Sequence, residues 1–287
     1  MATLAADSEE ARRVDAALSA WRQGDFTLDE TWFVHVGDGA YPLTDTAAEA
    51  EGDGVQALTS EVMGLVVVSQ TCDIVRGCTA RPFVEVAPLV DIPDADYHQV
   101  KKGRRPALAA LPNLEAERLV VDLDRVMTVE KSVVATWRRT PGHDTDYDAR
   151  VFAQALARKR ARFAFPDDFT ALARKLQHRL TEKHDKATDE GRGLRALREI
   201  RIRATPSWDA PEVELLFWFI RNDTDATFEG KSWADLLPAW LKFVSAEGRF
   251  RHVYGQVSTL RDMTAEEYND SDPLDLDHLS TTDMASP

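Results

Sequence analysis

Five polar or reactive side chains stand in a row directly after a short apolar run: Ser69, Gln70, Thr71, Cys72 and Asp73 follow residues 65–68. The apolar run, three of whose four residues are valine, predicts a buried strand. Its end would therefore hold hydroxyl, thiol and carboxylate groups together, and the candidate catalytic residues are Ser69, Thr71, Cys72 and Asp73. As a nucleophile, Cys72 would need a nearby base and a lowered pKa. The alternative is a half-buried thiol that packs well at a strand end.

A second kind of candidate site is a set of basic side chains on two predicted helices. Residues 150–203 carry 15 basic and 7 acidic residues, although the whole chain has a net charge of −14. Such helices are typical of surfaces that track a phosphate backbone, so a partner protein, RNA or DNA is expected to bind through residues 150–203. The alternative is pairing with the protein's own acidic residues, since residues 1–100 carry 18 acidic and 5 basic side chains. The candidate nucleic-acid-binding residues are Arg158, Lys159, Arg160, Arg162, Arg174, Lys175 and Arg179.

Neither a metal site nor a cofactor is expected. Cys72 and Cys78 are the only cysteines, and their spacing lacks the second close pair of a structural zinc site. Asp122 and Asp124 would share one face of a strand, as the two carboxylates of a metal-dependent nuclease do. Glu130 and Lys131 follow, but as neighbours they would point to opposite faces of a strand, which favours a solvated strand face over a nuclease site.

The elements that would position these residues indicate an α+β protein. Strands are expected at 64–69, 81–88 and 118–124, two basic helices at 151–162 and 166–183, and strands again at 199–203 and 212–220, with a helix at 232–244 and a strand at 252–257. In the strand at 199–203, Ile200 and Ile202 would face inward and Arg201 would face water. The predicted organisation is an N-terminal helix (1–22), a β domain (23–140), a domain of helices and an antiparallel sheet (147–269) and an acidic tail (270–287), with a linker around 141–146. No apolar run approaches the length of a membrane span, and the two cysteines fit a cytoplasmic location.

Three pieces of the N-terminal half, within residues 23–92, resemble the MazF/PemK growth-inhibitor toxins. They are Gly24-Asp25-Phe26, the valine-rich strand at 64–69 that ends in serine, and the strand at 83–89. The resemblance implies a small SH3-like β-barrel and a cytoplasmic endoribonuclease paired with an antitoxin. It also implies catalysis by an arginine in the first hairpin loop and a Ser/Thr at the end of the valine strand. Ser69 or Thr71 matches the second position, whereas no arginine occurs between Arg22 and Arg76.

Two classes of function therefore follow from the sequence. The leading prediction is a non-catalytic binding or accessory protein of a bacterial toxin–antitoxin or defence type, contacting nucleic acid or a partner protein. The alternative is an endoribonuclease or other hydrolase that uses residues 69–73. The sequence leaves open whether the protein is an enzyme.

Overall fold

A computed structural model describes residues 3–101, 105–161, 163–222 and 226–274. The chain divides into two compact units, residues 1–161 and 162–287, and each combines helices with strands. The predicted α+β class is confirmed.

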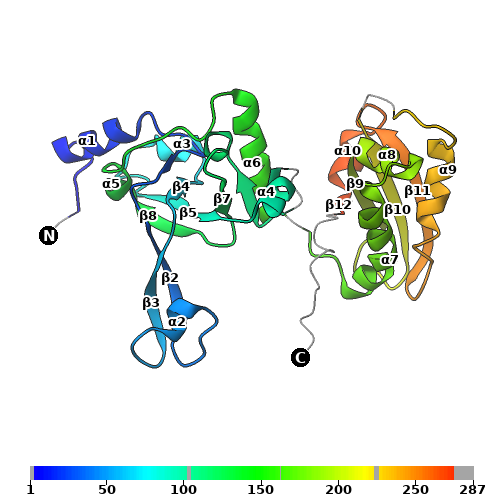
Figure 1. Cartoon of the computed structure of the whole chain (residues 1–287), viewed down its shortest axis with the longest axis horizontal. Helices are drawn as coiled ribbons and strands as arrows, with labels where there is room; N and C mark the ends of the chain where they lie inside the picture. The colour runs from blue at the N-terminus through cyan, green and yellow to red at the C-terminus, as the bar shows by residue number, and fades with distance from the viewer. Residues whose placement is uncertain (1–2, 102–104, 162, 223–225, 275–287) are drawn as a thin grey trace. The chain divides into compact units, whose positions relative to one another are not determined.

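The first unit is built on a six-stranded sheet in which every pairing is antiparallel (Figure 1). Strand β5 is its centre: it pairs with β4 along one edge and with both β8 and β7 along the other. β1 pairs with β4, and Phe26 of β1 also forms an isolated bridge to Thr140. The strands are β1 (Phe26–Thr27), β4 (Leu65–Val67), β5 (Phe83–Asp91), β6 (Leu108–Ala110), β7 (Leu119–Asp122) and β8 (Met127–Glu130).

Strand β4 is buried on both faces, which explains its unbroken apolar sequence. Val66 packs with Phe26 and Phe152 in one cluster, whereas Val67 packs with Trp21 in another. Short helices cover the face of the sheet on which Val67 lies, and a long helix covers the face on which Val66 lies. The helices of this unit are α1 (Glu9–Leu18), α2 (Asp45–Ala48), α3 (Thr71–Ile74), α4 (Asp94–Lys101), α5 (Lys131–Val134) and α6 (Asp146–Arg160), with a 3₁₀ turn at Pro112–Leu114.

Strands β2 (Trp32–Asp38) and β3 (Val55–Glu61) form a separate two-stranded hairpin. The hairpin extends away from the six-stranded sheet, with α2 near its tip (Figure 1). Because no basic residue lies between Arg22 and Arg76, this arm carries only negative formal charge.

Helix α6 belongs to the first unit, so the boundary between units lies later than the predicted linker at 141–146. Phe152 is 1% exposed and, with Leu156, packs against the β-sheet residues Val66 and Leu89. The sequence predicts an apolar stripe of Val151, Phe152, Ala155 and Leu156 on this helix; the last three pack against the sheet, whereas Val151 is exposed. The spacing of the stripe does not say which sheet it covers.

The second unit is a four-stranded sheet in the order β11-β10-β9-β12, with the helices α7, α8 and α9 packed on one face. Strands β9 and β10 are antiparallel, as predicted, but β10 and β11 depart from that expectation because they are parallel. Helix α9 lies between these two strands in the chain and provides the crossover that a parallel pair needs. Strand β12 pairs antiparallel with β9 and was not predicted, since it lies in the predicted acidic tail. The elements are α7 (Asp167–His184), α8 (Asp189–Ala196), β9 (Leu197–Thr205), β10 (Val213–Arg221), α9 (Trp233–Leu241), β11 (Phe250–Thr259), α10 (Ala265–Asn269) and β12 (Asp272–Pro273).

Strand β9 alternates as its sequence predicts, with one correction. Ile200 and Ile202 face the helices and are buried. Arg201, expected in water, is only 8% exposed because Tyr268 near the end of α10 stacks on its guanidinium at 4.0 Å. Ser271 accepts a hydrogen bond from the same guanidinium at 2.9 Å. The start of the predicted acidic tail is thus packed against the sheet, and residues 275–287 lie outside the described part of the chain.

Asp189, at the first turn of α8, holds a loop of the second unit. Its carboxylate accepts hydrogen bonds from the backbone N–H groups of Glu229, Gly230 and Lys231 at 2.8 to 3.0 Å. Arg192 donates to it at 2.8 Å. The amide donors first, and Arg192 with them, lower the pKa of Asp189 to about 2.

Candidate binding pocket

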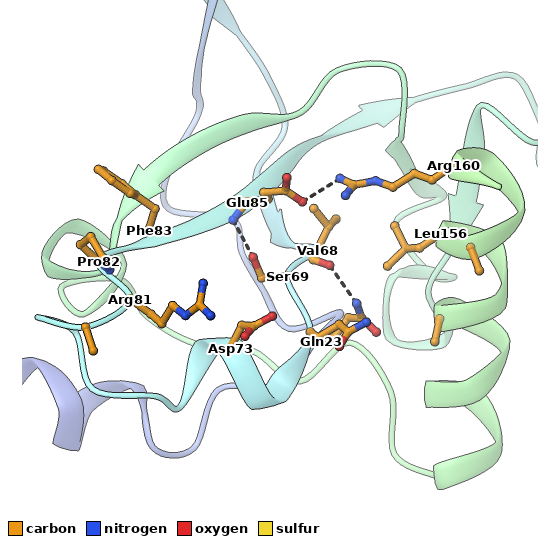
Figure 2. A pocket seen from close by; sticks show the side chains of 14 residues that line it. Gln23, Val68, Ser69, Asp73, Arg81, Pro82, Phe83, Glu85, Leu156 and Arg160 are labelled. Carbon is orange, nitrogen blue, oxygen red and sulfur yellow. Dashed lines mark hydrogen bonds and ion pairs between the residues drawn. The ribbon is translucent and has the colours of Figure 1, made fainter.

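A pocket of about 700 Å³ opens in the first unit, at the end of strand β4 that the sequence singled out. Its wall is formed by the segment after β4, by α3, by the beginning of β5 and by one face of α6 (Figure 2). Its volume is in the range of small-molecule sites. The lining residues are Gln23, Val68, Ser69, Gln70, Asp73, Ala80, Arg81, Pro82, Phe83, Glu85, Ala153, Leu156, Ala157 and Arg160.

The hydroxyl oxygen of Ser69 joins the end of β4 to the neighbouring strand. Its Oγ accepts a hydrogen bond from the backbone N–H of Glu85 at 2.7 Å. The N–H of Val68 donates to the carbonyl oxygen of Glu85 at 2.9 Å. The chain then leaves the sheet at Gln70 and enters α3. The hydroxyl therefore fixes the point where β4 ends, and Figure 2 shows it beside the pocket.

Gln23 closes the base of the pocket and connects three segments. Its Nε2 donates to the carbonyl of Val68 at 2.8 Å, and its backbone N–H donates to Oγ1 of Thr71 at 3.1 Å. Its carbonyl oxygen lies 2.9 Å from Nε2 of His143. Thr71 is thereby engaged in holding the backbone of Gln23, and it does not line the pocket.

A buried lysine holds the short helix α3 through hydrogen bonds to backbone carbonyls. Lys131 is 1% exposed, and its Nζ donates to the carbonyl oxygens of Asp73 at 2.7 Å and Arg76 at 2.6 Å. Burial removes water from the ammonium and lowers the pKa of Lys131, although the charge of nearby Asp15 acts in the opposite direction. Lys131 therefore positions the helix that carries Asp73 and does not itself reach the pocket.

Most charges that line the pocket are paired. Arg160 of α6 forms an ion pair with Glu85 at 2.7 Å, and Asp73 pairs with Arg76 at 3.5 Å. Within the described part of the chain, the guanidinium of Arg81 has no ion pair and no hydrogen-bond partner. In Figure 2 its side chain extends along the pocket towards Asp73 and Ser69. The pocket thus offers one uncompensated positive group.

The predicted catalytic residues separate in the structure. Ser69 and Asp73 line the pocket, whereas Thr71 is engaged with Gln23 and the exposed Cys72 is not among the lining residues. The nearest polar partner of the Cys72 thiol is Oε1 of Gln70, at 3.6 Å. The other thiol, Cys78, is buried, and burial together with the neighbouring Asp15 raises its pKa. Neither thiol has the arrangement of an activated nucleophile.

Three polar or charged lining residues were not predicted from the sequence: Gln23, Arg81 and Glu85. Gln23 precedes the Gly24-Asp25 pair, and Arg81 and Glu85 come from the strand that follows the cysteines. The one signal that could have indicated Arg81 and Glu85 was the strand expected at 81–88. Residues at the start of that strand lie beside the end of β4 if the two pair antiparallel.

The predicted basic patch is divided between the two units. Arg158, Lys159 and Arg160 end α6 in the first unit, and Arg174, Lys175 and Arg179 belong to α7 in the second. Three of them pair within their own unit: Lys159 with Asp124, Arg160 with Glu85, and Arg179 with Glu190. Arg174 and Lys175 are exposed, and Arg162 lies outside the described residues. These ion pairs agree with the alternative that basic side chains meet the protein's own acids.

The carboxylates considered for a nuclease do not converge. Asp122 accepts a hydrogen bond from Arg125 at 2.7 Å, Asp124 pairs with Lys159, and Lys131 points to α3. Among the described residues, no group of three or more His, Cys, Asp or Glu side chains is arranged to hold a metal ion.

The chemistry of the pocket is therefore that of hydrogen bonding and charge pairing. No histidine is among the residues that line it, so Ser69 has no imidazole base.

No protein family, curated protein or solved structure matches the chain. Among the helices in the described ranges, none has both the length and the apolar character needed to cross a membrane.

Proposed function

We propose that the protein is a non-catalytic binding protein that holds part of a partner protein in the pocket of its first unit. One observation carries this proposal: Arg81 is the charged lining residue without a partner in the described part of the chain, while Asp73, Glu85 and Arg160 are paired. Glu85 pairs with Arg160, and the Ser69 hydroxyl accepts from the Glu85 amide. A site built in this way recognises a ligand through polar groups that are already held in position. It lacks the paired nucleophile and base of a hydrolase.

A toxin–antitoxin or defence setting and an SH3-like barrel in the first unit are part of this proposal and rest on the resemblance described above. Support for a barrel comes from β5, which is shared by β4, β7 and β8, and from the bridge between Phe26 and Thr140. Pairings of this kind bring the two ends of a small sheet towards closure.

One observation favours the endoribonuclease as a second candidate. Arg81 and Ser69 line the same pocket, and the resemblance implies an arginine and a serine or threonine for RNA cleavage. Arg81 would then supply the guanidinium that the first hairpin lacks.

The two candidates are separated by measuring cleavage and stability in the same variants. We expect the full chain to leave a pool of random-sequence single-stranded RNA uncut, and Ser69→Ala, Cys72→Ala and Asp73→Ala to change only stability. RNA cleavage that disappears in Ser69→Ala and Arg81→Gln, with an unchanged thermal transition, would replace the binding protein by the nuclease. Cys72→Ala is the matched control, because its side chain lies beside the pocket segment but does not line the pocket.

A further inference from the structure

The pocket contains a stretch of sheet edge at Phe83 that no other strand of the described residues pairs with on the pocket side. Strand β4 pairs with residues 86–88 of β5 and then turns away at Ser69. In an antiparallel strand, the backbone groups of alternate residues point to the same side. The N–H and C=O of Glu85 point to the β4 side, where they meet Ser69 and Val68, and the C=O of Pro82 points to the β8 side, where Lys131 N–H donates to it at 2.8 Å. The N–H and C=O of Phe83 therefore face the pocket, beyond the end of β4.

Charged and apolar groups flank this edge. Arg81, two residues before Phe83, has no counter-ion in the described part of the chain. The Phe83 side chain is 54% exposed, and Pro82 and Leu156 also line the pocket. Figure 2 shows Arg81 and Phe83 at the same end of the pocket as Pro82, with Leu156 across it on α6. The site thus combines a backbone donor and acceptor, one cation and an apolar wall.

We propose that this pocket binds an extended acidic segment of a partner protein, which pairs its backbone with Phe83 and places a carboxylate at Arg81. The inference rests on the proposed function and names the chemistry of its ligand. Extended peptides commonly bind by adding to an open sheet edge, where backbone hydrogen bonds provide affinity and neighbouring side chains provide selectivity. A guanidinium binds a carboxylate through charge-assisted hydrogen bonds.

The charges favour a peptide over a nucleic acid. Residues 1–161 carry 18 basic and 26 acidic side chains, a net charge of −8. The carboxylates of Asp73 and Glu85 lie in the pocket itself. They would repel a chain of phosphates that approached the arginines of the pocket. A single carboxylate needs only the one unpaired cation that Arg81 supplies.

The test uses the full chain and an array of seven-residue peptides, acetylated and amidated at their ends, in which one position at a time is fixed and the others are degenerate. We expect selection of Asp or Glu next to an apolar residue. For a selected peptide, fluorescence anisotropy should show at least about tenfold weaker binding when its acid is replaced by the amide, and the same loss in Arg81→Gln. Arg13→Gln is the control, because Arg13 is an exposed arginine of α1 that pairs with Glu9 outside the pocket.

A scan with N-methylated peptides tests the backbone pairing. Methylation removes one peptide N–H at a time, so a single position should abolish binding if it donates to the carbonyl of Phe83, while methylation of its neighbours has a smaller effect. Uniform tolerance of methylation would overturn the pairing at Phe83, and selection without acids, or full binding by Arg81→Gln, would overturn the role of Arg81.

A pool of single-stranded RNA oligonucleotides, tested in parallel, distinguishes failure of this inference from failure of the proposed function. RNA that binds uncut while all peptides fail would overturn the peptide ligand and the partner protein, and would leave the non-catalytic binding role of the proposed function. RNA that is cut, or failure of both peptides and RNA to bind, would overturn the proposed function together with the inference.

Discussion

Replacing Lys131 by methionine tests whether a buried lysine holds the wall of the pocket. The substitution keeps an unbranched side chain of similar reach and removes the donor of two hydrogen bonds, to the carbonyls of Asp73 and Arg76. A buried acceptor that loses its partner costs about 1–3 kcal/mol. Arg76 is exposed and its carbonyl regains water, and methionine also removes the cost of burying an ammonium. We therefore expect Lys131→Met to lower the free energy of unfolding of the first unit by about 2 kcal/mol.

The assay is urea unfolding combined with hydrogen exchange, read by mass spectrometry in peptides from β4, β5 and residues 71–76. These peptides report the first unit alone. Lys101→Met is the matched control, since Lys101 forms an exposed ion pair with Glu115 at 2.6 Å and should contribute less than about 1 kcal/mol. A Lys131→Met protein within about 0.5 kcal/mol of the wild type, with unchanged exchange at 71–76, would refute the reasoning.

The pH dependence gives the same experiment a second readout. The pKa of Lys131 is lowered from 10.5 in the folded state, mainly because burial desolvates the ammonium. Between the lowered pKa of the folded state and 10.5, the unfolded chain binds more protons than the folded protein, so the stability of the wild type rises with pH. The cost of burying the charged ammonium is fully present below the folded pKa and is relieved as the pH rises above it. The stability difference between wild type and Lys131→Met should therefore grow as the pH approaches 10.5. A difference that stays flat or shrinks would contradict this sign.

Three further predictions concern the rest of the chain. Gly142→Ala should destabilise the first unit by about 1–3 kcal/mol in urea unfolding, because a Cβ at this position would lie 2.0 Å from the carbonyl oxygen of Gly24; an unchanged midpoint would contradict this. In a native thiol titration with a disulfide reagent, Cys72 should react rapidly and the buried Cys78 only on unfolding, so two fast equivalents would be the wrong result. Asp189→Asn should speed hydrogen exchange at the three amides that the carboxylate accepts from, and in the wild type this protection should be present above pH 3.8 and disappear only as the pH falls through about 2.

The sequence predicted the strand that matters most and the position of the pocket along the chain. An unbroken apolar run had to be buried on both sides, and the polar residues after it had to lie at a strand end, which is where Ser69 and Asp73 are found. Hydrophobic spacing also predicted the apolar stripe of α6, apart from the exposed Val151, and the alternation of Ile200 and Ile202.

The spacing of apolar residues does not show which elements pack against each other. The differences between the prediction and the structure have this cause. The stripe of α6 could cover either sheet, and only packing assigns Phe152 to the first unit. The parallel pairing of β10 with β11 depends on where α9 returns the chain. Arg201 is buried because a distant aromatic ring stacks on it. Arg81 was missed for the same reason, since its place beside Ser69 requires the register of β4 against β5.

The bridge between Phe26 and Thr140 has a consequence for the order in which the protein folds during its synthesis. β1 pairs with Thr140, and Asp25 pairs with Arg139 at 2.5 Å, so residues 114 positions apart must meet. The first unit cannot close its sheet until nearly all of it has been made, and Phe152 of α6 completes the core later still. Contacts this distant in sequence make folding slow, because the loop must close before they form. Until α6 emerges, the growing chain exposes the same valine-rich strand that ends at the pocket, and this is the stage at which aggregation or capture by a chaperone would compete with folding.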